Sequence, residues 1–277
     1  MDLERRFEGL RERKEGAFMP HIYYGDPYLG FSERLVDTLS TNGADMIEFG
    51  IPFSDPTADG PTFQVVCQRA LKRGITPSEC IMGLERLRKD GLNAPVIVTT
   101  YYNIPYIMGI ECFLEKIKSA GAQGVIIPNL PYEEANSLLK EARRHNIHII
   151  LQVAPNTTEE RLSRIAEASS GFIYIINVEG VTGVRERFQS STFKLINRVR
   201  KHTDLPILAG FGISNQKQAS SMVAAGADGI VAGSVFAQIY EKSINEPESR
   251  LQEISILSKQ LKAGCIEGYN KRTIAKK

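Results

Sequence analysis

The sequence predicts an α/β fold, a single (β/α)8 TIM barrel over residues 1–277 with extra helices at the N-terminus and in a loop. Three observations support this prediction. Short apolar runs alternate with amphipathic stretches along the whole chain, there are eight such runs, and 277 residues suit a fold that typically needs about 250. An open doubly wound sheet is the structural alternative, but it would leave two edge strands that the pattern does not mark.

The eight apolar runs are the expected strands. They are rich in Val and Ile and do not alternate with polar residues, which is typical of parallel strands buried on both faces. They cover residues 17–24, 45–50, 94–101, 124–128, 148–153, 172–177, 206–211 and 229–233. Eight strands of this kind separated by crossover helices indicate a closed barrel.

The stretches between the strands have helical periodicity, with one apolar stripe and charge on the opposite side. The clearest cover residues 32–43, 113–121, 133–146 and 215–226, and extra helices are expected at 2–13, 62–73 and 246–263. Gly43, Gly121 and Gly226 are each followed by Ala and, shortly after, by an apolar strand. Each glycine is therefore expected to end a helix with a positive φ angle.

The composition narrows the class of protein. With 42% hydrophobic residues, 24% charged residues and a net charge of +2, the chain is typical of globular proteins and gives little support for nucleic-acid binding. No apolar run approaches the roughly 20 residues that span a bilayer, and residues 1–14 lack the apolar core of a signal peptide, so we expect no membrane association and a cytoplasmic location. The four cysteines have no CxxC spacing and are expected to be reduced and mostly buried: Cys67, Cys80, Cys112 and Cys265.

In a TIM barrel the active site lies in the loops after the strands, and the second strand carries an unusual residue there. Glu48 stands in the middle of an otherwise apolar strand. A buried carboxylate is costly unless it is paired or serves a reaction, so Glu48 is interpreted either as a structural residue bonded to a neighbour or as a catalytic one.

The loop 51–61 that follows this strand contains a second carboxylate of interest, Asp59, and Pro61 is well placed to open a helix. Asp59 either helps to cap that helix or faces the same substrate as Glu48. Two carboxylates in different environments can have their pKa values pushed apart and so divide acid and base roles.

Glycine-rich turns follow the last strands and predict a phosphate site. The segment 210–214 follows the seventh strand, residues 233–234 follow the eighth and open a helix, and 180–183 follows the sixth. Glycine lets backbone N–H groups approach an anion closely, and a helix N-terminus favours negative charge. A tight turn is the alternative interpretation of each segment taken singly.

The missing residue types are also informative. None of the eight predicted strands contains a lysine for Schiff-base chemistry. His145, His148 and His202 fall at helix ends or at a strand start, and only His21 could line the barrel interior, so no metal site is expected. Proton transfer by carboxylates is the chemistry that remains.

At these residues the sequence resembles the tryptophan synthase α subunit family over nearly the whole chain. Its most specific segment is GADMIEFGIPFSDPTADGPTFQ at 43–64, supported by GDP at 25–27, LPYEEA at 130–135, GVTG at 180–183, GFGIS at 210–214 and GADGIVAGS at 226–234. The resemblance implies retro-aldol cleavage of indole-3-glycerol phosphate to indole and glyceraldehyde 3-phosphate, as a step of tryptophan biosynthesis.

The same resemblance implies individual roles. Glu48 matches the acid/base that protonates the indole carbon and helps to deprotonate the glycerol hydroxyl, and Asp59 matches the residue that stabilises charge at the indole nitrogen. Phosphate binding falls on Gly183, Gly212, Gly233 and Ser234. The indole pocket, its approach and the lid fall on Tyr101, Tyr174, Thr182 and Phe211, with 180–192 resembling a mobile lid.

The family works as an α2β2 heterotetramer whose β subunit carries pyridoxal phosphate, so a β partner docked near Ser54–Thr57 is implied, with no cofactor on this chain. The sequence departs from the family pattern at a few positions, which are His21, Thr57, Asn129 and Asn177–Glu179. Three alternatives remain: a free-standing indole-3-glycerol-phosphate lyase, a weakly catalytic barrel that mainly binds and activates a β subunit, and a phosphate-binding barrel with another substrate.

Overall fold

The computed structural model describes residues 2–176, 185–210 and 212–275, and its strands form one parallel sheet. The strand order is β5-β4-β3-β2-β1-β9-β8-β7-β6. The strands are β1 (Ala17–Tyr23), β2 (Ile47–Gly50), β3 (Val96–Thr99), β4 (Gly124–Ile126), β5 (His148–Ile149), β6 (Gln152–Val153), β7 (Ile173–Ile176), β8 (Ile207–Gly210) and β9 (Gly229–Ala232). Each lies within one of the eight predicted runs.

The sheet closes into a barrel through the fifth predicted run, 148–153, which the structure divides into β5 and β6. Its first half pairs with β4 and its second half pairs with β7. Between the halves, Ile150 N–H donates to Val125 O at 3.1 Å, and Leu151 O accepts from Tyr174 N–H at 3.2 Å. One chain segment therefore bridges the two ends of the strand order, and the predicted (β/α)8 barrel is confirmed.

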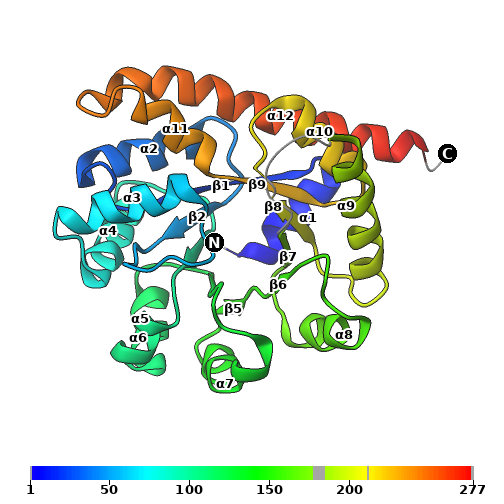
Figure 1. The fold of residues 1–277 in the computed structure, drawn as a ribbon, viewed down its shortest axis with the longest axis horizontal. Coiled ribbons are helices and arrows are strands. Elements are labelled where there is room, and N and C mark those ends of the chain that lie inside the picture. Colours follow the sequence, from blue (N-terminus) through cyan, green and yellow to red (C-terminus); the bar gives the residue numbers. More distant parts are fainter. Residues whose placement is uncertain (1, 177–184, 211, 276–277) are drawn as a thin grey trace.

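Helices surround the strands (Figure 1). They are α1 (Leu3–Glu12), α2 (Leu29–Thr41), α3 (Pro61–Lys72), α4 (Pro77–Lys89), α5 (Asn103–Met108), α6 (Ile110–Ser119), η1 (Tyr132–Glu134), α7 (Asn136–Arg144), α8 (Glu159–Ala168), α9 (Arg185–Arg200), α10 (Gln216–Ala224), α11 (Ser234–Glu241), η2 (Pro247–Arg250) and α12 (Leu251–Ala275). No helix in the described part of the chain is long and apolar enough to cross a bilayer.

The strands bury different side chains on their two faces. A large outer cluster, which includes Phe18, Ile47 and Phe49, packs between the sheet and the helices. A smaller inner cluster fills the barrel and includes Met19 and Met46. Because successive side chains of a strand point to opposite faces, Met46, just before β2, and Glu48 on β2 both point inward. The inner cluster also contains Leu3, Phe7 and Leu10 of α1, so this helix packs against the barrel interior.

Local signals explain several element boundaries. Pro61 opens α3 as predicted, since an N1 residue needs no intrahelical N–H bond. Gly43, Gly121 and Gly226 have φ angles of 109°, 92° and 111°, as predicted. Thr76 forms a capping box with Glu79 at the start of α4.

The C-terminal helix is longer than the predicted 246–263, because α12 runs to Ala275. Gly264 and Gly268, which favour a helix end in the sequence, instead face α10. A Cβ at either position would lie 2.4 Å from a backbone oxygen of α10, so glycine permits the close contact between these helices. Lys262 anchors α12 to the barrel through Asp45 at 2.8 Å and Glu15 at 3.0 Å.

Candidate active site

Glu48 lies on the inward face of β2 and is 1% exposed. In the β1–β2 pairing it stands opposite His21, and Thr99 ends the neighbouring strand β3 on the same inward side. The Thr99 hydroxyl donates to Glu48 Oε1 at 2.6 Å. Glu48 Oε2 is buried and has no hydrogen-bond partner among the described residues. The carboxyl group is thus fixed through one oxygen and leaves the other available.

Burial sets the protonation of Glu48. It raises the pKa of the carboxyl from 4.5 to about 8, the Thr99 hydrogen bond opposes this shift, and the charge of Asp59 adds to it. A group with a pKa near 8 is mostly protonated at neutral pH and can still release its proton, which suits an acid that later acts as a base.

His21 contacts Glu48, but the contact is not an ion pair at neutral pH. Its Nδ1 atom lies 3.6 Å from Glu48 Oε1. Burial lowers the pKa of His21 to about 3, and its charged form is therefore not populated while Glu48 holds its proton. The imidazole packs on two aromatic rings, with centroid distances of 5.0 Å to Tyr23 and 4.6 Å to Phe63, and these two rings also contact each other at 5.2 Å.

Asp59 is held at the mouth of the barrel by two phenols. Tyr23 and Tyr101 both donate to its Oδ2 atom, at 2.6 Å and 2.7 Å. The Tyr101 oxygen also accepts from Ala58 N–H at 3.0 Å, which ties the loop to the strand end. Asp59 does not cap α3: Gly60 is the N-cap residue and no side-chain cap hydrogen bond is formed. The helix-cap interpretation of Asp59 is therefore wrong.

The surroundings of Asp59 have opposing effects on the pKa of its carboxyl group. Burial raises the pKa of its carboxyl, and the hydrogen bonds from Tyr23 and Tyr101 lower it. Both bonds engage Oδ2, so Oδ1 remains available within the described part of the chain. Glu48 and Asp59 are also close enough for the charge of one to raise the pKa of the other.

Aromatic side chains line the region around these carboxyl groups. Tyr174 is buried on the inward face of β7, and the charges of Glu48 and Asp59, after burial itself, raise the pKa of its phenol. Tyr101 stacks on Phe53 at a centroid distance of 5.3 Å. Both phenols thus lie near the two carboxyl groups, and their role in an indole pocket stays a prediction.

The turns after β8 and β9 each contain a glycine, and the structure requires glycine for a different reason in each turn. Gly212 has a φ angle of 62°, a conformation that favours glycine. At Gly233 a Cβ atom would lie 2.6 Å from the Phe63 ring and 3.0 Å from Cβ of His21, so a side chain there would clash. Ser234 is the first residue of α11, whose N-terminus therefore opens at this turn.

Several predicted site residues lie outside the described residues. They are Thr182, Gly183, Phe211, the first part of the predicted lid at 180–184, and the Asn177–Glu179 departure. From Arg185 onward the predicted lid belongs to helix α9. The other departures are described: Asn129 Oδ1 accepts from Tyr102 N–H at 2.8 Å, and Thr57 is exposed in the 51–61 loop.

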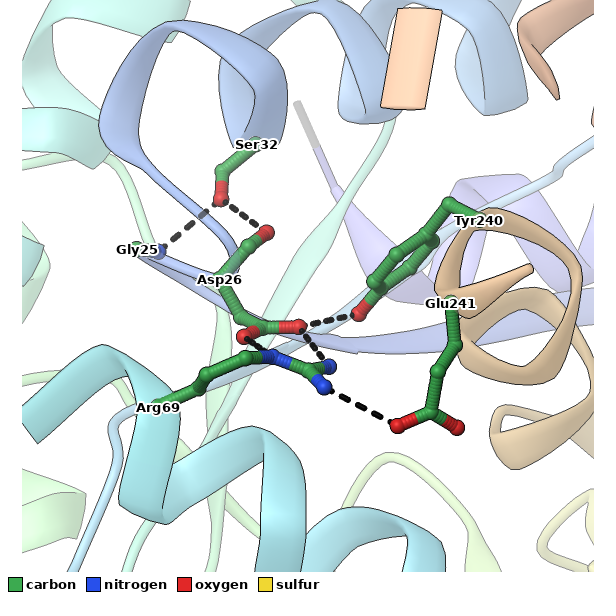
Figure 2. Close-up of polar contacts among 6 residues, drawn as sticks. All are labelled: Gly25, Asp26, Ser32, Arg69, Tyr240 and Glu241. Carbon is green, nitrogen blue, oxygen red and sulfur yellow. Dashed lines mark hydrogen bonds and ion pairs between the residues drawn. The ribbon is translucent and has the colours of Figure 1, made fainter. Parts of the chain in front are cut away.

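Figure 2 shows a polar network around the buried Asp26 that joins the loop after β1 to α3 and α11. Asp26, 1% exposed, accepts from Arg69 Nε at 2.7 Å and Nη2 at 2.9 Å, and from the Tyr240 hydroxyl at 2.6 Å. Arg69 also donates to Glu241 at 2.9 Å. Since α3 follows the 51–61 loop and α11 begins at the candidate phosphate turn, this network fixes these two helices relative to each other.

Sequence reasoning missed two polar side chains of the site, Thr99 and Tyr23. Thr99 could have been found from strand periodicity, because it lies two residues before Tyr101 and so faces the same side. Tyr23 is likewise two residues after His21 on β1. Its contact with Asp59 depends on the path of the 51–61 loop, which has no periodic signal.

Comparison with known proteins shows that this chain is similar to tryptophan synthase alpha chains. The sequence model of the family described as tryptophan synthase alpha chain matches residues 7–265. The alpha chain of Gloeobacter violaceus is 42% identical over 260 residues, covering 94% of this chain and 93% of the relative. That of Methanosarcina mazei is also 42% identical, covering 96% and 94%.

Solved structures agree in fold. A structure of Mycobacterium tuberculosis tryptophan synthase matches with a TM-score of 0.86 and 31% identity, covering 95% of this chain and 97% of that chain. The tryptophan synthase alpha subunit of Legionella pneumophila strain Paris matches with a TM-score of 0.85 and 28% identity, covering 98% and 99%.

Proposed function

Because this chain belongs to the tryptophan synthase alpha chain family, we propose that it cleaves indole-3-glycerol phosphate to indole and glyceraldehyde 3-phosphate as an alpha subunit. The observation that carries the proposal is the pair of carboxyl groups, one inside the barrel and one on the loop after the same strand. Family membership favours this role over a free-standing lyase, an activator without significant catalysis and a barrel for another substrate.

The reaction needs two proton movements and one bond cleavage. A proton is added to the indole carbon that bears the glycerol chain, which places positive charge on the ring nitrogen. The adjacent hydroxyl then loses its proton and becomes the aldehyde, while the carbon–carbon bond breaks and its electron pair returns to the indole ring. The substrate itself accepts the electron pair, so the chain needs no electron-accepting cofactor for this step.

Glu48 is the proposed proton donor and acceptor. With a pKa near 8 it holds a proton at neutral pH that it can give to the indole carbon. The resulting carboxylate then takes the proton of the reacting hydroxyl, which returns Glu48 to its initial state. Thr99 fixes Oε1 at 2.6 Å, so the proton moves at the unpartnered Oε2.

Asp59 is the proposed partner of the indole N–H. Its Oδ2 atom is held by two phenols, and Oδ1 can accept a hydrogen bond from the ring nitrogen as positive charge develops there. The apolar surface of Tyr101 and Tyr174 strengthens that interaction because it lowers the local dielectric. By the family match, Phe211 and Thr182 complete the pocket and the 180–192 lid closes over it.

The phosphate is proposed to bind at the opposite end of the substrate, on Gly183, Gly212, Gly233 and Ser234. The start of α11 supports this assignment, since the unpaired N–H groups and the dipole of a helix N-terminus favour an anion.

We further propose that residues 1–277 act as one domain in the cytoplasm and assemble with a β subunit as α2β2, with pyridoxal phosphate on the β subunit only. Exposed apolar residues near the 51–61 loop support a docking face for the β subunit there. Tyr106 and Ile107 of α5 are 68% and 82% exposed and follow β3, next to the strand whose loop carries the exposed residues Ser54, Asp55 and Thr57.

The test is indole release from indole-3-glycerol phosphate by the purified chain, with and without a β subunit. We expect indole from the wild-type chain, a higher rate with the β subunit, and losses of at least about a hundredfold in Glu48→Gln and Asp59→Asn. Glu8→Gln and Asp37→Asn, which change exposed carboxylates on α1 and α2, are the matched controls and should retain the wild-type rate. Full activity of Glu48→Gln would refute the proposal.

A further inference from the structure

His21 has a buried nitrogen that the rest of the site leaves without a partner. Among the described residues, four buried side-chain polar atoms lack a hydrogen bond: His21 Nε2, Glu48 Oε2, Thr100 Oγ1 and Ser258 Oγ. The first two belong to residues that stand opposite each other on β1 and β2. Buried polar atoms are normally satisfied, so two unpartnered atoms on paired residues of one site indicate a polar ligand.

The position of His21 narrows what that ligand group can be. On one side its Nδ1 atom lies 3.6 Å from Glu48 Oε1. On the other side its Cβ lies 3.0 Å from where a Cβ of Gly233 would stand, at the candidate phosphate turn. His21 is therefore located between the proposed proton donor and the proposed phosphate site.

The proposed substrate carries groups that suit the carboxyl groups, His21 and the glycine turn in the same order. Its indole ring and reacting hydroxyl belong at the carboxyl groups, and its phosphate belongs at the glycine turn. Between them the chain carries one more hydroxyl, which does not react and is retained in glyceraldehyde 3-phosphate. A substrate that spans the two ends of the site brings this hydroxyl past His21.

We propose that His21 binds the non-reacting hydroxyl of the glycerol chain through Nε2 and so selects substrates that carry it. This inference rests on the proposed function. It assigns a substrate contact to a residue beside the two carboxyl groups.

The protonation state of His21 suits this contact. Burial lowers the pKa of the imidazole to about 3, so at neutral pH the ring has one donor nitrogen and one acceptor nitrogen. A hydroxyl can both donate and accept, so Nε2 can bond to it in either tautomer. The packing of the ring on Tyr23 and Phe63 fixes its plane before the substrate arrives.

The test compares two substrates in four proteins. The substrates are indole-3-glycerol phosphate and its analogue with hydrogen in place of the non-reacting hydroxyl. The proteins are wild type, His21→Phe, His21→Asn and His21→Gln. Phe keeps an aromatic ring in contact with Tyr23 and Phe63, Asn keeps a polar group only near the position of Nδ1, and Gln can reach the position of Nε2.

The wild type should prefer the hydroxylated substrate in kcat/KM by about tenfold, the loss expected when one hydrogen bond to a neutral group is removed. His21→Phe and His21→Asn should show nearly equal kcat/KM for both substrates, and His21→Gln should restore part of the preference. Most of the change should appear in KM, because the hydroxyl is bonded equally in the ground state and the transition state.

Two outcomes would overturn the inference. One is an equal loss for both substrates in His21→Phe and His21→Asn, which is the result expected of a purely structural residue. The other is an unchanged preference in these variants. If the wild type releases no indole from either substrate, the proposed function itself fails, and the inference fails with it. Far-ultraviolet circular dichroism and the thermal midpoint establish that each variant is folded.

Discussion

Replacing Glu48 by Gln should stabilise the protein in a pH-dependent way while it removes activity. Gln resembles the protonated carboxyl in shape and keeps an oxygen to accept the Thr99 hydroxyl, but it cannot ionise. In the folded wild type, burial raises the pKa of Glu48 from 4.5 to about 8. Below pH 4.5 the carboxyl is protonated in both the folded and the unfolded protein, and the contribution of Glu48 to the stability of the folded state is largest. This contribution is lost as the pH rises to about 8.

The magnitude follows from the two pKa values. Each pH unit between 4.5 and about 8 weakens the folded state by about 1.4 kcal/mol, so the whole interval costs about 5 kcal/mol. That is a large part of the stability of an ordinary domain, typically about 5–15 kcal/mol. The Gln variant escapes this cost, and its stability advantage over the wild type should grow steadily across the interval.

The assay is urea unfolding of the wild type and Glu48→Gln at several pH values from 5 to 8.5, in steps of about half a unit. Glu8→Gln is the matched control, because it makes the same chemical change at an exposed site on α1. The free energy of unfolding of Glu48→Gln should exceed that of the wild type by an amount that increases with pH, and Glu8→Gln should follow the wild type. Parallel curves for all three proteins would refute the reasoning.

Three further predictions concern other parts of the site and its support. Tyr23→Phe removes one of the two hydrogen bonds to Asp59 and should lower kcat/KM for indole release by about tenfold, and an unchanged value would contradict the assigned role of this contact. Lys262→Met leaves Asp45 buried without its ion-pair partner and should reduce the free energy of urea unfolding by about 3–5 kcal/mol, with turnover of the folded protein retained. A loss below about 1 kcal/mol would show that the pair does not anchor α12. Ser234→Asp places a negative charge at the start of α11 and should raise KM for the phosphorylated substrate at least about tenfold, whereas an unaltered KM would exclude phosphate binding there.

Most of the fold could be predicted from the sequence, because the barrel is built from local patterns. Continuous apolar runs specify strands buried on both faces, and the glycines at 43, 121 and 226 specify helix ends. The exceptions have long-range causes. The fifth strand is divided because its two halves pair with different neighbours, and α12 passes Gly264 and Gly268 because these glycines fit against α10.

The two carboxyl groups of the candidate site could be predicted from the sequence, but the side chains that hydrogen-bond to them could not all be predicted. Glu48 interrupts an apolar strand, which makes it visible in the sequence. Tyr23 could not be assigned to Asp59, because that contact depends on the path of the irregular 51–61 loop. The sequence also left open whether Asp59 caps a helix, and only the position of Gly60 at the N-cap excludes that role. The roles of all the predicted site residues stay predictions, and Thr182, Gly183 and Phe211 lie outside the described residues.

The most direct test of the account is a crystal structure of the Glu48→Gln variant with indole-3-glycerol phosphate bound and uncleaved. The account predicts that the carboxylate of Asp59 lies within hydrogen-bond distance of the indole nitrogen, that the side chain of residue 48 faces the carbon that is protonated, and that the phosphate lies at the start of α11. An indole ring bound away from Asp59, or a phosphate located elsewhere, would contradict it.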